Sequence, residues 1–292
     1  MEAEQLGTFG LFVDRQSLSM SAKLSVLVRC REEAERLGHR PYLIFPVEMR
    51  KIQRMDGLFI RTRTDILNST YVASRMAELH GIPVIDDSRS IRICSDKVNM
   101  YLHLMHEGVV IPPTELLKRG EDLEARAEEL FSEWGEELIL KEPSTSYSAR
   151  VRKVDSVSEF LRTASSYLHL SDELVAQQYI DSEEDWRIGV LNGRFLFASR
   201  YIQPSMSAKP EEEDELVYYG IEMLPRSEVP SRIIDLAVQA ASAIGNGLYS
   251  VDVKESEGRM YVIEVNDNPS LENGEERLYP DIIEKIILSL MR

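Results

Sequence analysis

The chain has 292 residues, of which 43% are hydrophobic and 29% are charged, and its formal net charge is -16 with a pI near 4.9. This length suits two or three modules with a substantial core rather than one small domain. Nucleic-acid-binding proteins usually carry a basic face, so the acidic balance argues against nucleic acid as a partner. The acid-rich runs at residues 121–137 and 211–215 are interpreted as solvated surface, and a surface for a cationic partner is the alternative.

The two cysteines, Cys30 and Cys94, lie in separate apolar stretches. Two isolated cysteines form neither a disulfide framework nor a zinc site, so we expect buried free thiols in a reducing cytoplasm. The first ten residues lack the basic and apolar segments of a signal peptide. No apolar run approaches the length of about 18 residues that crosses a membrane, so no membrane partner is expected.

Up to about residue 90, short apolar runs alternate with helical patterns. The apolar runs predict strands at Leu6–Val13, Pro41–Phe45, Gly57–Thr62 and Pro83–Asp87. A first helix is predicted over Lys23–Leu37, with an inward face of Leu24, Leu27, Val28, Ala34 and Leu37. A second helix follows a cap at Asn68 or Ser69, with an inward face of Val72, Met76 and Leu79. This alternation predicts a wound, parallel sheet in a first domain at residues 1–90.

Residues 91–180 form the expected second region. Ser95 can cap a helix over Asp96–His106, whose inward face would be Val98, Leu102 and Met105. Helices are further predicted at Leu123–Trp134 and Ser158–Leu168. Strands are predicted at Glu137–Pro143, within Ser146–Val154 after a turn, and at Leu174–Ile180.

Residues 181–292 form the expected third region. Two apolar runs flank Asn192-Gly193, which predicts a hairpin, and a second hairpin is predicted across Glu257-Gly258. Pro204–Val217 reads as a polar loop, expected to be mobile. Pro230 can begin a helix that buries Ile233, Ala237, Ala240 and Ile244. A last helix is predicted over Pro280–Met291.

Three oxygen-bearing side chains gather at the last hairpin. Glu264 and Asn266 are two residues apart on one strand and therefore share a face, which Asp252 can join from the neighbouring strand. Two carboxylates and an amide oxygen suit Mg²⁺, which takes one or two carboxylates together with substrate phosphates. A polar, solvent-facing side of the hairpin is the alternative.

Two lysines and one extended segment are candidates for binding a nucleotide. Lys97 lies in the first turn of a predicted helix and Lys141 at the end of an apolar strand, where each can neutralise a phosphate. A solvated lysine is the alternative for either. The backbone at 177–180 can present a carbonyl and an N–H to an adenine edge, and Asp185 can accept ribose hydroxyls.

Two further patterns are weaker candidates. His103 and His106 share a helix and could bind a metal, but no third ligand is evident, so surface histidines are favoured. Arg61 and Arg63 follow a strand and could hold an anionic substrate, although an ion pair with Asp56 or Asp65 explains them equally well.

Together, these parts resemble the ATP-grasp enzymes, and most closely the RimK-type glutamate ligases and the bacterial glutathione synthetases. The resemblance runs from about Gly57 to Glu276, with the parts in the family's order: IRICSDKVNM, ELILKEPSTSYSARVRKV, LVAQQYIDSEEDWRIGVL, FLFASRY, GLYSVDV and MYVIEVNDNPSLENGEE. It implies an α/β protein with an ATP-grasp fold, α+β in its ATP-binding part, behind an N-terminal parallel-sheet domain. Residues 91–180 would supply the lid and the adenine-binding strands, and residues 181–292 the metal site.

The resemblance also implies roles for individual residues. ATP would be contacted by Lys97, Lys141, the backbone of Gln178, Tyr179 and Ile180, and Asp185 at the ribose. The phosphate and the acyl-phosphate intermediate would face Arg187 and Arg200. Two Mg²⁺ ions, replaceable by Mn²⁺, would be bound by Asp252, Glu264 and Asn266. The substrate would lie near Asn268, with Arg61 and Arg63 as anion-binding candidates.

The chain departs from the family's pattern at the phosphate loop. The stretch Ser144–Arg150 contains no glycine, whereas the family's loop is usually glycine-rich so that backbone N–H groups approach phosphate closely. The hydroxyls of Ser146 and Ser148 are expected to replace those donors.

The implied activity is an ATP-dependent carboxylate–amine ligase that forms an amide through an acyl phosphate, acting on amino acids or peptides. The alternatives are a small-molecule kinase on the same fold and a non-catalytic nucleotide-binding protein. The identity of both substrates stays open, as does the oligomeric state, for which a homodimer is the commonest symmetric choice.

Overall fold

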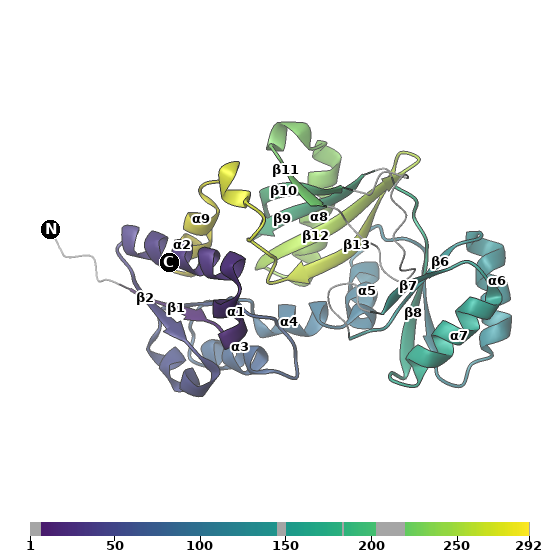
Figure 1. Cartoon of the computed structure of the whole chain (residues 1–292), viewed down its shortest axis with the longest axis horizontal. Helices are drawn as coiled ribbons and strands as arrows, with labels where there is room; N and C mark the ends of the chain where they lie inside the picture. Colours follow the sequence, from purple (N-terminus) through teal and green to yellow (C-terminus); the bar gives the residue numbers. More distant parts are fainter. Residues whose placement is uncertain (1–6, 145–149, 183, 203–219, 292) are drawn as a thin grey trace.

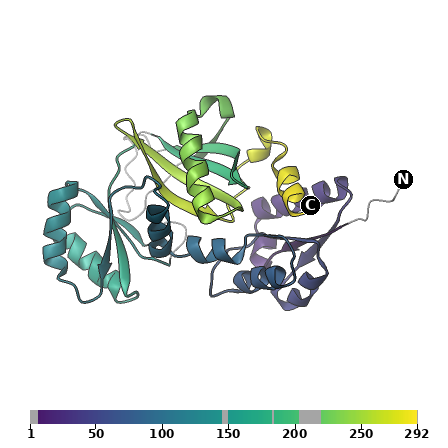
Figure 2. The ribbon, with the colours of Figure 1, turned by 180° about the vertical axis from the view of Figure 1, so that it is seen from behind.

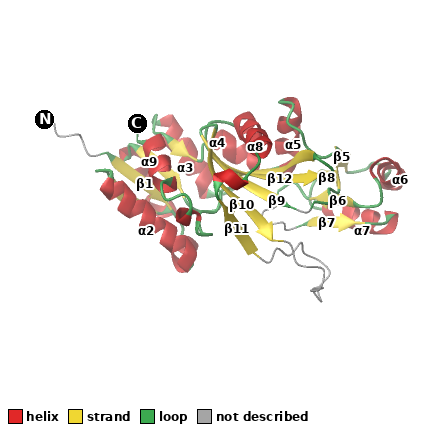
Figure 3. Cartoon of the chain, turned by 90° about the horizontal axis from the view of Figure 1, so that it is seen from above, coloured by secondary structure: helices red, strands yellow, loops and turns green. Residues whose placement is uncertain are grey.

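The computed structural model describes residues 7–144, 150–182, 184–202 and 220–291. Three sheets follow one another along the long axis of the molecule (Figures 1 and 3). Sheet A has the strand order β2-β1-β3-β4 and is parallel, as predicted for the first region. Its strands are β1 (Thr8–Phe12), β2 (Arg40–Ile44), β3 (Gly57–Ile60) and β4 (Val84–Ile85).

Helices cover both faces of sheet A. One face packs on α2 (Ser21–Arg36) and α9 (Ile282–Leu290), and the other on α3 (Ser69–Leu79) and the 3-10 segment η1 (Pro46–Arg54). A short helix, α1 (Arg15–Ser19), precedes α2, and Asp14 caps it. Asn68 caps α3 by accepting from the Thr70 N–H, which confirms one of the two predicted caps.

The predicted inward faces of these helices were partly wrong. In α2, Leu24 and Val28 are exposed, and the buried side chains are Val26, Leu27, Cys30 and Ala34. In α3, Val72 and Leu79 are exposed, and the buried side chains are Thr70, Ala73, Ser74 and Ala77. Small side chains let α3 lie close to its neighbours, and the Ser74 hydroxyl donates to the Asp86 carbonyl at 2.8 Å.

Two helices connect sheet A to the rest of the molecule (Figure 1). The first, α4 (Ser88–Cys94), was not predicted; Asp87 caps it by accepting from the N–H groups of Arg89 and Ser90. The second, α5 (Lys97–His106), is capped by Asp96 rather than by Ser95. Leu102 and Met105 of α5 are exposed, contrary to prediction, whereas Val98, Met100, Tyr101 and Leu104 are buried.

Sheet B is antiparallel with the order β5-β8-β6-β7. Its strands are β5 (Thr114–Lys118), β6 (Leu138–Lys141), β7 (Val151–Val154) and β8 (Glu173–Gln178), and β5 was not predicted. The helices α6 (Leu123–Trp134) and α7 (Val157–Leu168) pack together on one face through an apolar cluster. The opposite face is left for the cavity described below.

Sheet C is antiparallel with the order β11-β10-β9-β12-β13. Its strands are β9 (Asp185–Leu191), β10 (Arg194–Ile202), β11 (Gly220–Leu224), β12 (Leu248–Ser256) and β13 (Arg259–Asp267). Both predicted hairpins are confirmed, and at the first turn Asn192 and Gly193 take left-handed φ angles of 50° and 69°. Helix α8 (Ser231–Ile244) covers the back of the sheet (Figure 2) and buries the four predicted side chains. A 3-10 turn, η2 (Arg226–Glu228), precedes α8.

Gly189 in β9 lies directly across from Phe197 in β10. A Cβ atom at Gly189 would come within 2.2 Å of the Phe197 ring. We therefore expect Gly189→Ala to lower the free energy of unfolding by about 1–3 kcal/mol, measured by urea denaturation. Because Phe197→Leu makes room at the ring, the double variant should lose less stability than the sum of the two single variants, and simple additivity would contradict this account.

The C-terminal helix α9 lies against sheet A although it is last in the chain (Figures 1 and 2). A 3-10 turn, η3 (Glu275–Arg277), precedes it. Its buried side chains are Ile282, Ile283, Ile286, Ile287 and Leu290. The first core is thus completed by residues from the third predicted region.

Cys30 and Cys94 are free thiols, and Cys30 is buried while Cys94 is only partly exposed. Among the described residues, no helix combines the length and apolarity that crossing a membrane requires. The serines Ser146 and Ser148 and the loop Pro204–Val217 lie outside the described residues.

Candidate active site

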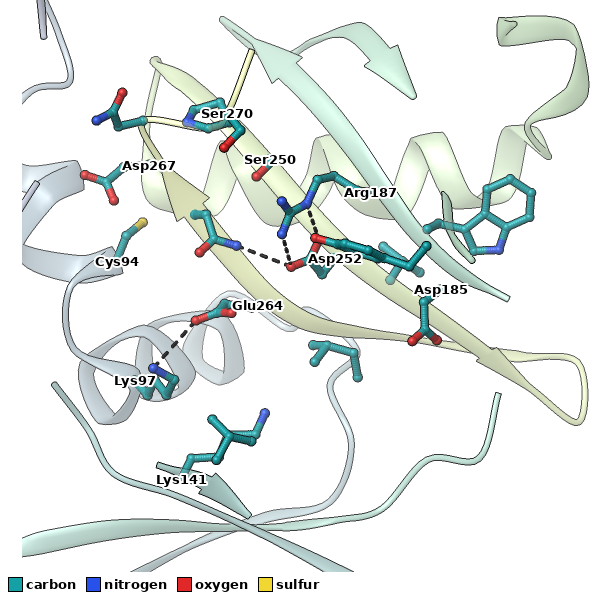
Figure 4. A pocket seen from close by; sticks show the side chains of 18 of the residues that line it. Cys94, Lys97, Lys141, Asp185, Arg187, Ser250, Asp252, Glu264, Asp267 and Ser270 are labelled. Carbon is teal, nitrogen blue, oxygen red and sulfur yellow. Dashed lines mark hydrogen bonds and ion pairs between the residues drawn. The ribbon is translucent and has the colours of Figure 1, made fainter. Parts of the chain in front are cut away.

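A cavity of about 460 Å³ lies between sheets B and C. The amino end of α5 and the loops after β3 and β13 complete its wall. Its lining brings together most of the predicted residues: Lys97, Lys141, Gln178, Tyr179, Ile180, Asp185, Arg187, Asp252, Glu264, Asn266, Asn268, Arg61 and Arg63. Figure 4 shows the two lysines across the cavity from the carboxylates of sheet C.

The three expected metal ligands lie side by side on β12 and β13. Asp252 pairs directly with Glu264 in the register of the two strands, and Asn266 lies two residues further along β13. The Asn266 amide nitrogen is 3.4 Å from Asp252 Oδ2. This shared face is the one that the sequence predicts, and its oxygens are the donor set that suits a divalent cation with phosphates.

Arg187 is bound to this carboxylate group. It lies across from Asp252 in the register of β9 and β12, and its Nε and Nη2 donate to the two Asp252 oxygens at 2.8 and 2.9 Å. Burial alone would lower the pKa of Arg187, but the Asp252 carboxylate outweighs it, so the pKa lies above its usual value. A carboxylate has about four lone-pair sites, so Asp252 retains acceptor capacity beside this fork.

Arg200 does not line the cavity, contrary to the prediction that it faces the phosphate. It pairs with Glu184 at 2.7 Å and with Glu222 at 2.8 Å. A β-bulge between Phe195 and Phe197 shifts the register of β10 against β9 by one residue. A one-residue shift moves every following side chain to the other face of a sheet, so Arg200 points away from the cavity.

The same bulge brings Tyr201 to the face that bears Asp185 and Arg187. The Arg187 guanidinium lies 4.9 Å from the centre of the Tyr201 ring, which also lines the cavity. Tyr201 was not predicted, because a simple two-residue turn at Asn192-Gly193 would place its side chain on the face opposite to Asp185 and Arg187. No sequence signal marks the bulge.

Both predicted lysines point into the cavity and are almost fully buried (Figure 4). Lys97 begins α5, and its Nζ lies 3.7 Å from Glu264 Oε1. Lys141 ends β6, and its Nζ donates to Tyr101 Oη at 2.6 Å and to Gln177 Oε1 at 2.8 Å. Tyr101 was not selected from the sequence, and Gln177 was considered only for its backbone.

The predicted adenine segment follows β8 and forms one end of the cavity. The Gln178 N–H already donates to the Pro113 carbonyl at 2.9 Å. The Ile180 carbonyl lies 3.5 Å from Lys254 Nζ, which also pairs with Asp185 at 3.4 Å. Lys153 and Lys254 lie over the Tyr179 ring at 4.5 and 5.7 Å. This end therefore combines a carboxylate with an aromatic ring near two ammonium groups, and Lys254 is an addition to the predicted set.

Arg61 is held by the loop after β13. Its Nη1 donates to Asn268 Oδ1 at 2.6 Å and to the Pro269 carbonyl at 3.0 Å, and its Nη2 donates to Glu272 at 3.0 Å. Asn268, with a left-handed φ of 46°, in turn donates to the Thr62 carbonyl at 2.5 Å. Neither Asp56 nor Asp65 is the partner of Arg61, and its contacts tie the first domain to this loop.

Arg63, in contrast, is half exposed at the cavity wall. It lies 3.6 Å from Asp65, the ion pair that the sequence offered as an alternative to anion binding. At this separation the pair is loose and exposed, and such pairs contribute little to stability. Arg63 is therefore the more available of the two arginines for an anionic substrate.

Two further carboxyl groups lie near this end of the cavity: Asp86 is buried, and Asp267 is partly buried and lines the cavity. Burial, followed by the nearby Asp267 charge, raises the pKa of Asp86 well above its usual range. Burial likewise raises the pKa of Asp267 to about 7. Asp267 and Cys94 line the cavity beside the metal-ligand candidates (Figure 4). Neither carboxyl group was singled out from sequence.

The fold is shared with solved structures. A D-alanine–D-alanine ligase from Bacillus anthracis matches with a TM-score of 0.75 at 19% identity, covering 98% of this chain and 97% of that one. A RimK domain ATP-grasp protein from Sphaerobacter thermophilus matches with a TM-score of 0.68 at 16% identity, covering 96% and 99%. These structures share the arrangement of two antiparallel sheets next to a parallel-sheet domain.

The sequence comparison names the family. A family model described as an ATP-grasp domain matches residues 94–270, more than half of the chain. The chain therefore belongs to the ATP-grasp family. A relative named glutamate–LysW ligase ArgX, from Sulfolobus acidocaldarius, is 27% identical over 222 residues, which are 74% of this chain and 75% of that protein.

Proposed function

We propose that this ATP-grasp ligase joins a carboxylate to an amine, using ATP and passing through an acyl phosphate. The observation that carries the proposal is the cavity in which Lys97 and Lys141 face Asp252, Glu264 and Asn266. Similarity to a relative named as a glutamate ligase supports the same reaction class.

The chemistry has two steps. A carboxylate oxygen of the first substrate attacks the γ-phosphorus of ATP, and ADP leaves. The amine nitrogen then attacks the acyl carbon, phosphate leaves, and the amine gives up a proton. Lys97 and Lys141 bind the phosphates, while Arg187 holds the transferred phosphoryl group. Catalysis rests on positioning and charge neutralisation, because little covalent chemistry falls to the protein in phosphoryl transfer.

We assign Asp252, Glu264 and Asn266 to Mg²⁺. Two carboxylates and one amide oxygen on one sheet face fit the hard oxygen ligands of this ion. Bound here, two Mg²⁺ ions would neutralise phosphate charge, and Mn²⁺ can substitute for them. Arg187 orients the Asp252 carboxylate for this role, because its fork contacts both oxygens.

The adenine edge is assigned to the backbone at Gln178–Ile180, and the ribose to Asp185. The substrates enter from the other end of the cavity, where Arg63 is available for an anionic group and Asn268 lies beside the acceptor. An amino acid or a peptide fits this anion-binding end, and a glutamate substrate is consistent with the relative's printed name.

The proposal is tested by measuring ADP release over a panel of acids and amines with Mg-ATP. Hydroxylamine should intercept the acyl phosphate as a hydroxamate when the true acid is present, because acyl phosphates are reactive electrophiles. ADP release should require the acid, and fast turnover should also require the amine. A stable phosphate monoester as product would indicate a kinase instead. ATP bound tightly with no ADP formed across the panel would indicate a non-catalytic protein.

A further inference from the structure

Lys141 Nζ is held by two oxygen acceptors inside the cavity wall. Lys141 is 5% exposed, and its Nζ donates to Tyr101 Oη at 2.6 Å and to Gln177 Oε1 at 2.8 Å. Tyr101 comes from α5 and Gln177 from β8, so two different elements fix the position of one amine.

Both acceptors are oriented by further hydrogen bonds. Tyr101 Oη donates its single hydrogen to the Ile263 carbonyl at 2.5 Å, so towards Lys141 it can only accept. Gln177 Nε2 donates to Thr114 Oγ1 at 2.8 Å, and Thr114 donates to the Pro112 carbonyl at 2.7 Å. This chain directs Gln177 Oε1 towards the lysine. Each chain of hydrogen bonds ends on a backbone carbonyl, which can only accept, so the direction of donation in each chain is fixed.

These two bonds use two hydrogens of the amine. A neutral amine has two N–H groups and one lone pair, whereas an ammonium has three N–H groups. The amine therefore satisfies both acceptors in either form. Figure 4 shows its nitrogen directed into the cavity, so the lone pair or the third hydrogen is left on that side.

The charges around Lys141 oppose one another. Burial lowers its pKa to about 7, where the carboxylates of Glu264 (β13) and Asp252 (β12) favour the charged form and Lys97 (α5) and Lys254 (β12) disfavour it. Tyr101 keeps its proton, because burial raises the pKa of its hydroxyl above the usual range. The empty cavity thus holds an amine that can be neutral near physiological pH without losing a hydrogen bond.

We propose that Tyr101 and Gln177 are positioning residues that hold Lys141 so that it takes up one proton when a nucleotide phosphate enters the cavity. The proton passes from the buffer to the Nζ lone pair, forming one N–H bond that then donates to the phosphate. This inference rests on the proposed function only in that ATP is taken to bind in this cavity.

The direction of the pH dependence follows from the pKa. Below about pH 7, the lysine of the empty protein is already charged and ATP binding takes up no proton there. Above it, the lysine is mostly neutral when empty and charged when phosphate is bound. ATP affinity should therefore fall as the pH rises from about 7 to about 9, by up to about tenfold per pH unit.

Titration calorimetry with Mg-ATP, in two buffers of different ionisation enthalpy, measures the proton uptake. At about pH 8 we expect close to one proton per ATP for the wild type. Lys141→Arg keeps its charge at every working pH and should take up none at this site. Equal proton uptake in both proteins would overturn the inference.

Tyr101→Phe tests the positioning role. It removes one acceptor, and an ammonium loses more from this than a neutral amine does. ATP affinity should fall about 3–10-fold at pH near 8 and less at pH near 6. The matched control is Tyr249→Phe, which removes another buried hydroxyl, bonded to Ser90 Oγ at 2.6 Å, and should leave the pH profile unchanged.

Three outcomes separate the possibilities. A larger loss at high pH in Tyr101→Phe alone supports the inference. An equal loss at every pH, or the same change in Tyr249→Phe, shows a merely structural role and overturns it, while the ligase proposal stands. No ATP binding by the wild type would overturn both.

Discussion

Arg187→Ala is expected to lower turnover by at least about 100-fold, the usual cost of removing one positioned donor from developing charge. Turnover is measured as ADP release with the acid and amine that the panel identifies. Arg200→Ala, one strand away, should change turnover by no more than about twofold, because its side chain is a partly exposed ion-pair partner on the other face. Arg200→Ala is thus the matched control for Arg187→Ala.

Loss of folding has to be separated from loss of catalysis in the first variant. Removing Arg187 leaves Asp252 without its forked partner, so thermal unfolding must be recorded alongside turnover. Arg187→Lys retains the charge but not the planar fork, and it should recover stability more fully than turnover. Equal activity in Arg187→Ala and Arg200→Ala would remove the phosphoryl-holding role from Arg187.

Glu264→Gln should lower turnover by at least about 100-fold at low Mg²⁺, because a metal ion supplies several kcal/mol of charge stabilisation. The substitution keeps the shape of the side chain and removes its charge. Part of the loss should be recovered at high Mg²⁺, because the weakened site refills by mass action. A Mg²⁺ titration of ADP release measures both effects.

Two further variants make this result specific. Glu222→Gln removes a carboxylate from β11, outside the cavity lining, and should keep the wild-type Mg²⁺ dependence. Asn266→Ala leaves the contact of Glu264 with Lys97 intact and should still raise the Mg²⁺ requirement. Wild-type Mg²⁺ dependence in both Glu264→Gln and Asn266→Ala would place the metal elsewhere.

Local rules predict only part of the metal-ligand face. Glu264 and Asn266 share a face through the two-residue period of a strand, but the turn at Glu257-Gly258 alone would pair Asp252 with Ile263, on the other face. The bulge between Asp252 and Val253 shifts the pairing by one residue and so places Asp252 opposite Glu264. Lys97 and Lys141 were predicted from segments that resemble the family, and both line the cavity.

Arg200 was assigned to the phosphate by the family resemblance, and a single extra residue in β10 places its side chain on the other face of the sheet. Propensity and periodicity carry no information on where such a bulge falls. The predicted inward faces of α3 and α5 were wrong for a related reason. Large apolar residues such as Leu79 and Leu102 were predicted to be buried, but they are exposed, and smaller or differently placed side chains pack against the neighbouring elements instead. The side-chain roles of Tyr101 and Gln177 were not predictable either, because both depend on the Lys141 amine, which a segment distant in the sequence supplies.

The position of α9 bears on how the chain folds during synthesis. Sheet A is built from the first third of the chain, yet part of its apolar face is covered by side chains such as Ile286 and Leu290 at the very end. Domains tend to fold as units as they leave the ribosome, the N-terminal one first. Here part of the apolar face of sheet A stays uncovered until sheets B and C have been synthesised. The order of translation and the order of core completion therefore differ, because α9 is made after sheets B and C and yet completes the core of sheet A.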